Sequence, residues 1–251
     1  LAFGAYWMKG DLDFSIVPNL KTVLRIGWMG IRLSSMDLMV LVNGQINILI
    51  IKYLVNNFES VGYFSRGQSV AMLAVTAGRA VMPLLFSRWA GIEKEKLASH
   101  AEKVIRFANT IAIIMIILIL VSGKFIILIL YGEQFLPALI PMMILLPGTV
   151  LYLVSSALLQ LLASRGKPEI SAFTLFCFAG FNAVLSWFLI PVMGINGAAL
   201  AATAGNCGLL VSLVMIVKYK HHIRIKKSLI MNRKDFLSIS NSLKSKKIMK
   251  I

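Results

Sequence analysis

The chain has 251 residues, of which 58% are hydrophobic and only 14% are charged, and its mean hydropathy is +0.82. Soluble domains are about 45–50% apolar and about 25% charged. An apolar excess of this size exceeds what one water-soluble core of this length can bury, so we expect an integral membrane protein. The composition excludes intrinsic disorder, collagen, a coiled coil and a secreted disulfide scaffold, the last because the chain has only 2 cysteines.

The first residues of the chain predict that further sequence precedes them. Residues 1–8 are apolar, start with Leu1 rather than methionine and run directly into Lys9. A secretory signal has its basic region before the apolar stretch. We therefore expect residues 1–32 to be the end of a preceding membrane helix and a cytoplasmic linker, with the rest of a longer protein, its N-terminal lobe, before them. The remaining domains are a six-helix lobe over 33–217 and a basic cytoplasmic tail over 218–251.

A membrane-spanning helix needs about 20 mostly apolar residues, and six segments of the chain meet this condition. The predicted fold is therefore an all-α, polytopic membrane protein. The fourth segment contains three prolines, which predict a kink or local unwinding that serves either gating or packing. The sixth is rich in glycine and alanine, which predicts close helix packing. The spans are predicted over residues 33–54, 61–87, 104–122, 136–164, 170–190 and 192–217.

The positive charges predict the orientation of these spans. The formal net charge is +16, and placing the C-terminus in the cytoplasm puts all but four of the 26 lysines and arginines on the cytoplasmic side, as the positive-inside rule requires. The tail carries eleven of them and one acidic residue, Asp235. A basic segment beside a membrane is attracted to anionic lipids. We expect anionic lipids, and no nucleic acid, to be the partners of this tail.

Charged residues inside a span cost at least ~2.5–3.5 kcal/mol near its centre and usually face a cavity or a partner. Arg66 and Arg79 lie in the second predicted span, thirteen positions apart, and therefore on different sides of the helix. Either arginine is a candidate for binding an anionic substrate. The alternative for Arg79 is an ion pair with Asp37 in the first span, and the alternative for Arg66 is snorkelling to the external headgroups.

The first span also carries a row of amides. Asn43 and Asn47 are four residues apart and share a helix face, whereas Gln45 does not lie on that face. Such residues suit either a water-filled cavity or hydrogen bonds between helices, and we count Asp37, Asn43 and Asn47 with the two arginines as candidate substrate-binding residues. No motif for a catalytic triad, a phosphate loop or a metal site is evident, so we expect neither a cofactor nor a catalytic residue, and no enzymatic activity.

Five stretches of the sequence, taken in order, carry a family resemblance. They include a Gly-Tyr-Phe-Ser opening of the second span, a Tyr-Gly turn, a Gly-Lys loop and a Gly-Ile-Asn-Gly-Ala-Ala start of the last span, and they lie at residues 62–67, 81–86, 130–138, 162–168 and 190–199. Together they resemble polysaccharide (O-antigen type) flippases of the multidrug/oligosaccharidyl-lipid/polysaccharide exporter superfamily. The resemblance covers about residues 20–217 and implies a protein of the bacterial cytoplasmic (inner) membrane.

The resemblance implies one lobe of a two-lobe transporter with twelve to fourteen helices. Its implied activity is flipping of an undecaprenyl-pyrophosphate-linked oligosaccharide by alternating access, with basic residues such as Arg66 and Arg79 attracting the pyrophosphate. Many relatives carry an acidic residue where Gln45-Ile46-Asn47 stands, and an amide there cannot carry a proton. Three alternatives remain: a cation-coupled multidrug exporter, a membrane polysaccharide polymerase or ligase, and a scaffold that transports nothing.

Overall fold

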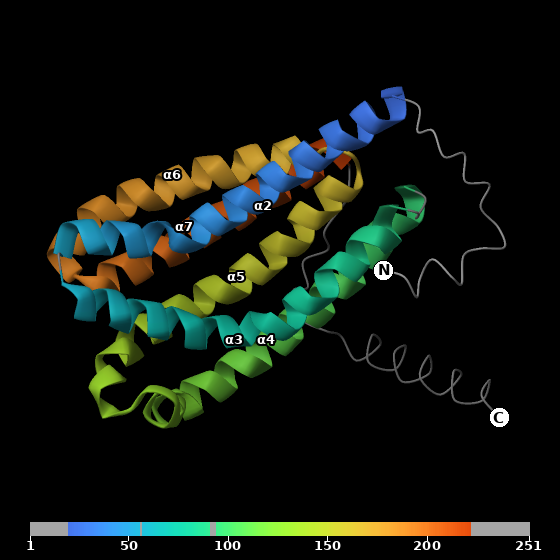
Figure 1. The fold of residues 1–251 in the computed structure, drawn as a ribbon. Helices are drawn as coiled ribbons and strands as arrows, with labels where there is room; N and C mark the ends of the chain where they lie inside the picture. The colour runs from blue at the N-terminus through green and yellow to red at the C-terminus, as the bar shows by residue number, and fades with distance from the viewer. Residues whose placement is uncertain (1–19, 56, 91–93, 222–251) are drawn as a thin grey trace, which may run out of the picture.

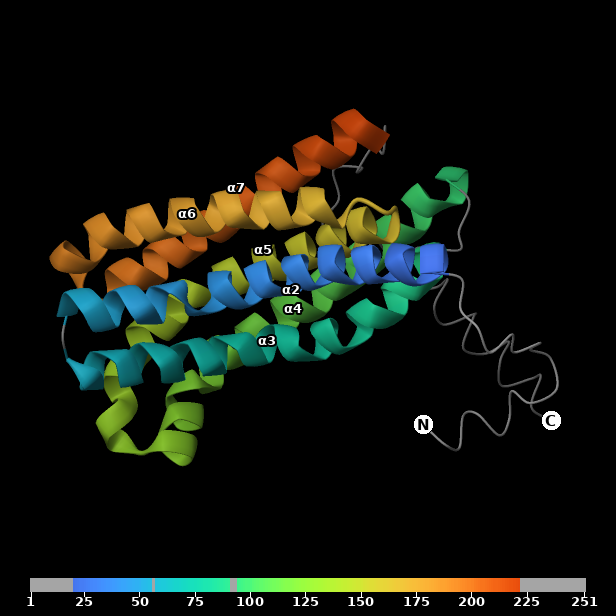
Figure 2. The ribbon, with the colours of Figure 1, turned by 45° about the horizontal axis from the view of Figure 1, so that its top comes forward.

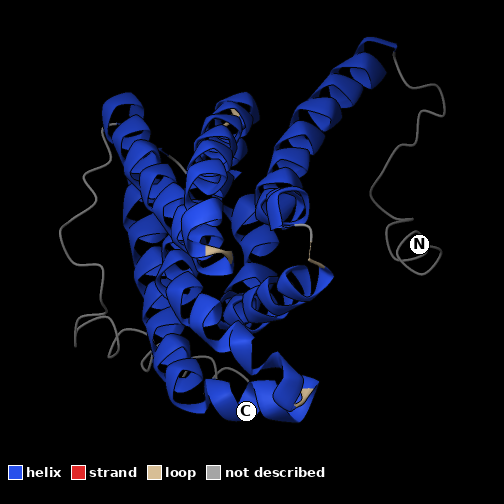
Figure 3. Cartoon of the chain, turned by 90° about the vertical axis from the view of Figure 1, so that its left-hand side faces the viewer, coloured by secondary structure: helices blue, strands red, loops and turns tan. Residues whose placement is uncertain are grey.

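The computed structural model describes residues 20–55, 57–90 and 94–221, and every element in these ranges is helical (Figure 3). Six long α-helices and one short 3-10 helix follow one another in the chain. This result confirms the prediction of an all-α, polytopic membrane protein. The elements are α2 (Leu20–Val55), α3 (Phe58–Ala90), α4 (Lys94–Tyr131), η1 (Glu133–Ala138), α5 (Leu139–Ser164), α6 (Pro168–Met193) and α7 (Ile195–His221).

The helices correspond to the six predicted spans, with three clear differences at their ends. Helix α2 begins at Leu20, well before the predicted start at Leu33. Helix α4 begins at Lys94 and continues to Tyr131, beyond both ends of the span predicted over residues 104–122. Within the described residues, five segments are long and apolar enough to cross a membrane, and α3 is not one of them, because polar side chains interrupt its apolar residues.

Helix α5 is the centre of the bundle. It packs along α3 on one side and α7 on the other, while α6 packs against α2 and α7 (Figures 1 and 2). The segment that contains η1 and α5 has 72% of its most apolar window buried, against 28% or less in the other four candidate spans. The surrounding helices expose large apolar side chains such as Phe173, Phe188 and Val192, which are suited to contact with lipid.

Close approach of helices in this bundle depends on small residues, as the sequence predicted for the last span. A Cβ atom on Gly148 of α5 would lie 2.9 Å from the Cα atom of Thr203 on α7, and one on Gly197 would lie 2.3 Å from the carbonyl oxygen of Leu189. Lipid tails are as apolar as the side chains, so helices in a membrane associate mainly through such tight packing. Helices α5, α6 and α7 are therefore held together largely by contacts that only glycine permits.

The prolines of the fourth predicted span differ in their effect on the helix. Pro137 lies in η1, where the chain forms a 3-10 turn before α5, so local unwinding is found at this point. Pro147 lies inside α5, which is helical from Leu139 to Ser164 without interruption. Thr203 of α7 donates a hydrogen bond to the carbonyl oxygen of Ile144, one turn before this proline, at 2.8 Å.

Three glycines of the described residues have a positive φ, and each ends a helix or lies in a connection: Gly132, Gly166 and Gly194, with φ of 85°, 73° and 59°. L-residues with a side chain rarely adopt this conformation, whereas glycine does so at no steric cost. All three are glycines of the stretches on which the family resemblance depends. The resemblance therefore includes residues that the chain needs to turn between helices.

Candidate functional site

A polar cavity of about 320 Å³ lies between α2 and α3, with α5, α6 and α7 behind it. These two helices are consecutive in the chain, but α2 lies mainly against α6 and only lightly against α3, which leaves the space open. The described residues that line the cavity include amides and hydroxyls and no charged side chain. The polar lining residues are Asn43, Gln45, Asn47, Ser65, Gln68, Ser69, Thr149, Tyr152, Asn182 and Asn206.

A buried hydrogen-bond network forms one wall of the cavity. The hydroxyl of Ser186 on α6 donates to the amide oxygen of Asn47 on α2 at 2.7 Å and also lies 3.3 Å from the amide oxygen of Asn182. All three side chains are at most 2% exposed. A polar group at this depth is costly unless it is hydrogen-bonded. The network therefore joins α2 to α6 and fixes the orientation of Asn47 and Asn182.

A second hydrogen bond crosses between the two helices that border the cavity. The amide nitrogen of Gln68 on α3 donates to the backbone carbonyl oxygen of Gly44 on α2 at 3.0 Å. Gly44 itself has open space where a Cβ atom would be. The bond therefore spans the opening between α2 and α3 at the level of Asn43 and Asn47.

Three amides of the lining make no hydrogen bond to any other residue in the described part of the chain: Asn43, Gln45 and Asn206. Asn43 and Asn206 are partly buried, and Gln45 is exposed at the cavity. Their donors and acceptors face the cavity without an internal partner. The sequence placed Gln45 on a different helix face from Asn43 and Asn47, and all three are among the residues that line the cavity.

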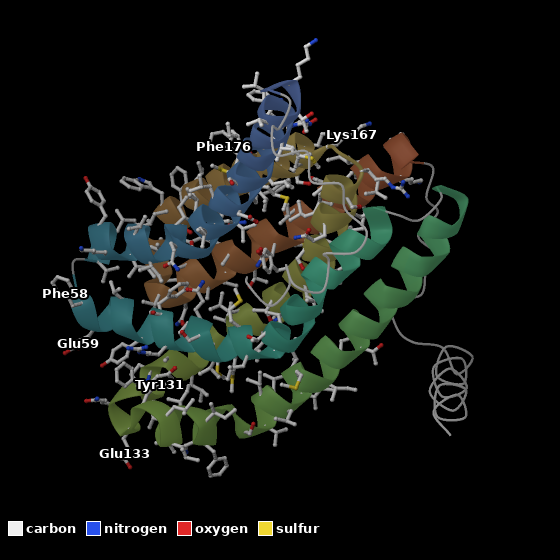
Figure 4. The ribbon with its side chains drawn as sticks, turned by 45° about the vertical axis from the view of Figure 1, so that its right-hand side comes forward. Phe58, Glu59, Tyr131, Glu133, Lys167 and Phe176 are labelled. Carbon is white, nitrogen blue, oxygen red and sulfur yellow. The ribbon has the colours of Figure 1, made fainter. Side chains whose placement is uncertain are left out.

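The charged candidates do not gather in this cavity. Asp37 is exposed and does not line it. Arg66 is also exposed, and its guanidinium lies over the ring of Tyr131 at 5.2 Å from the ring centre, a cation–π contact. Figure 4 shows Tyr131 at the end of the bundle that also carries Phe58 and Glu133. The side chain of Arg79 lies outside the described residues.

An aromatic cluster surrounds Arg66 at this end. Tyr63 meets Phe135 edge to face with ring centres 5.8 Å apart, and Tyr131 meets the same phenylalanine at 5.8 Å. These rings come from α3, α4 and η1. Arg66 contacts the ring of Tyr131 in this cluster and is not among the residues that line the cavity.

The opposite end of the bundle carries an ion pair that sequence reasoning missed. Arg32 of α2 binds the carboxylate of Glu169 at the start of α6 and donates to the carbonyl oxygen of Gly166 at 3.1 Å. Figure 4 shows the neighbouring Lys167 at this end, away from Tyr131. The sequence identified Arg32 only as a loop cation, because nothing in a single sequence relates it to a residue 137 positions later.

Sequence reasoning also missed the cavity amides outside the first helix, Gln68, Asn182 and Asn206, and the hydrogen-bond donor Ser186. A signal for two of them was present. Asn182 and Asn206 are amides in the interior of their spans, and the other large polar side chains of these spans lie near the span ends. An amide costs free energy in such a position, which marks it for a hydrogen bond or a cavity.

The fold and this site define a multi-pass α-helical membrane protein with a polar cavity inside its bundle. The family model for polysaccharide biosynthesis protein matches residues 1–140. This match covers more than half of the chain, and the chain belongs to that family.

A curated relative is the uncharacterized membrane protein of Methanocaldococcus jannaschii, which is 29% identical over 136 residues, or 54% of this chain. The aligned region spans 27% of that relative's length. The comparison with solved structures gave no match. The family and the relative together support a membrane protein of polysaccharide biosynthesis.

Proposed function

We propose that the full-length protein flips an undecaprenyl-pyrophosphate-linked oligosaccharide across the bacterial cytoplasmic membrane for surface polysaccharide synthesis. The observation that carries this proposal is the cavity between α2 and α3, in a chain that belongs to a polysaccharide biosynthesis family. Its lining of neutral amides and hydroxyls has the chemistry that recognises a polar, hydroxyl-rich solute. Apolar helices surround it on the outside, as a site for a lipid-linked substrate requires.

In this proposal transport is by alternating access and involves no covalent chemistry. The present lobe rocks against an N-terminal lobe, and the cavity opens to one side of the membrane at a time. Asn43 and Asn47 line the cavity that the substrate occupies. Arg66, Arg79 and Asp37 contribute to substrate binding outside the described lining of the cavity. The two arginines attract the pyrophosphate as it approaches.

The composition of the lining favours this function over export of cationic drugs. A cation-coupled exporter needs a carboxylate in its cavity, and among the described lining residues there is none. Asn47 occupies a position where an ion-coupling carboxylate would be expected, and its amide oxygen accepts a hydrogen bond from the hydroxyl of Ser186. The coupling of transport to a cation at this position is therefore not part of the proposal.

The proposal includes the surroundings of the protein. The C-terminus lies in the cytoplasm, and the basic tail over 218–251 rests on anionic lipids of the inner leaflet. The Arg32–Glu169 end of the bundle is then the cytoplasmic end, and the Arg66–Tyr131 end is the external one.

Deletion of the full-length gene tests the proposal. We expect undecaprenyl-pyrophosphate oligosaccharide to accumulate in lipid extracts of the deletion strain, measured by mass spectrometry, and to return to its normal level on complementation. Normal lipid levels with an undiminished surface polysaccharide would contradict the proposal. Increased sensitivity to cationic compounds in the same strain would favour the drug exporter.

A further inference from the structure

The cavity contains two kinds of amide, which differ in what they bind. Asn47, Asn182 and Gln68 use oxygens or nitrogens in hydrogen bonds to other residues. Asn43, Gln45 and Asn206 have no such bond within the described chain, although all three line the cavity. The first kind maintains the shape of the cavity, and the second kind presents free donors and acceptors to whatever enters it.

A free amide is matched best by a ligand group that both donates and accepts. Each amide offers two N–H donors and one carbonyl oxygen. A sugar hydroxyl donates one hydrogen bond and accepts others, so a row of hydroxyls satisfies such amides from either direction. A phosphate only accepts, and an ammonium only donates, so each leaves half of these groups unpaired in a site where unpaired polar groups are costly.

The electrostatics of the cavity point to the same class of ligand. No described lining residue is charged. An anion that entered the cavity would therefore lose its hydrating water without gaining an opposite charge from the lining. The nearest described arginine of α3, Arg66, is directed to Tyr131 and not into the cavity. The volume of about 320 Å³ is at the lower end of the range for small-molecule sites, about 300–1,000 Å³.

We infer that this cavity binds an uncharged, hydroxyl-rich segment of the glycan, and that Asn43, Gln45 and Asn206 are its recognition groups, while the pyrophosphate is held elsewhere. The inference rests on the proposed function for its lipid-linked substrate and adds which part of that substrate the cavity holds. The selectivity of the transporter for neutral sugars is then set by amides that α2 and α7 contribute to the cavity lining.

The test uses the full-length protein in lipid nanodiscs. The probes are oligosaccharides released by partial acid hydrolysis from the surface polysaccharide of the producing cells, separated into neutral and acidic fractions, and undecaprenyl pyrophosphate without sugar. Binding is measured with the wild type, with Gln45→Leu and Asn206→Leu, and with Gln134→Leu as a matched control. Gln134 is exposed in η1 and is not in the cavity.

We expect the wild type to bind the neutral fraction, and each cavity variant to bind it about three- to tenfold more weakly, the effect of one lost hydrogen bond. Gln134→Leu should bind like the wild type, and no variant should change the binding of undecaprenyl pyrophosphate. Retained thermal stability of the cavity variants establishes that they fold; Asn43→Leu replaces any variant that does not.

Two results would overturn the inference: binding of the acidic fraction alone, or equal neutral-sugar affinity in the wild type and the cavity variants. Its failure is distinct from failure of the proposed function. Lipid-linked oligosaccharide that accumulates in the deletion strain, together with unchanged binding in the variants, refutes only the assignment of the cavity. Amide-dependent binding without accumulation refutes only the flippase.

Discussion

Ser186 on α6 donates a hydrogen bond from its hydroxyl to the side-chain oxygen of Asn47 on α2, and the two oxygen atoms lie 2.7 Å apart in a buried position. This bond joins two helices that are far apart in the sequence and forms a wall of the polar cavity. Asn47 was predicted either to line a cavity or to bond between helices, and the structure shows that it does both.

Loss of this bond should lower stability by a small and measurable amount. Hydrogen bonds between membrane helices contribute about 0.6 kcal/mol on average and about 1.7 kcal/mol at most. We expect a coupling free energy in this range from a double-mutant cycle of Asn47→Ala and Ser186→Ala, measured by unfolding in detergent. Ser34→Ala, at an exposed position of α2, is the control and should change stability by less than about 0.5 kcal/mol. A coupling of zero would contradict the bond.

The contact of Gly148 with Thr203 predicts a strong effect of a single methyl group. Gly148→Ala would place a Cβ atom 2.9 Å from the Cα atom of Thr203, which cannot move without displacing α7. We expect this variant to be destabilised by about 1–3 kcal/mol, the cost of overpacking a closely packed site, and to show a lower Tm.

Gly180→Ala is the matched control for this prediction. Nothing lies within 4 Å of a Cβ atom at Gly180, which is in the middle of α6. Alanine is favoured over glycine inside a helix by roughly 0.5–1 kcal/mol, so this variant should be as stable as the wild type or more stable. Equal Tm values for the two variants would show that α5 and α7 do not approach each other as described.

The Arg32–Glu169 ion pair should contribute little to stability, because its side chains are 30% and 53% exposed. Ion pairs in contact with water contribute about 0.2–1 kcal/mol and weaken as salt rises. We expect a double-mutant cycle of Arg32→Ala and Glu169→Ala to give a coupling free energy in this range at low salt. At about 0.5 M salt the coupling free energy should be smaller, because dissolved ions screen the attraction between the two charges. A coupling well above this range that is independent of salt would mean that the pair is shielded from water.

Arg66 should affect the binding of the pyrophosphate and not the binding of neutral sugar. Hydrogen bonds to charged groups contribute about 1.5–3 kcal/mol, so Arg66→Gln should weaken binding of undecaprenyl pyrophosphate by about ten- to a hundredfold. Lys124→Gln removes an exposed cation from α4 and serves as the control. Unchanged binding in Arg66→Gln would leave the contact with Tyr131 as the role of this arginine.

Most of the fold was predictable from the sequence, because runs of apolar residues mark spans regardless of what they pack against. The ends of α2 and α4 were not, since a helix can continue past its apolar part through polar or interfacial residues. Asn43 and Asn47 were identified as site residues because amides are rare in a span. Ser186 was not, because the pairing of α2 with α6 depends on the three-dimensional arrangement. Asn182 and Asn206 carried the same signal as the amides of the first span and were overlooked.

The positions of the arginines show the same limit. Helical spacing indicated that Arg66 and Arg79 point in different directions, but it does not say which neighbour each meets. The contact of Arg66 with Tyr131 joins residues from α3 and α4 that no periodicity relates. An expectation of a cationic cavity was drawn from the sequence, whereas the described lining of the cavity is neutral.

The most direct test of the account is a translocation measurement on the purified full-length protein in lipid vesicles. Lipid-linked oligosaccharide extracted from the producing cells is placed in both leaflets, and an added membrane-impermeant glycosidase cleaves only the outer molecules. We predict that cleavage proceeds to near completion in vesicles with wild-type protein and slows in vesicles with the double variant Gln45→Leu, Asn206→Leu. Cleavage that stops at about half in wild-type vesicles, as in protein-free ones, would contradict the account.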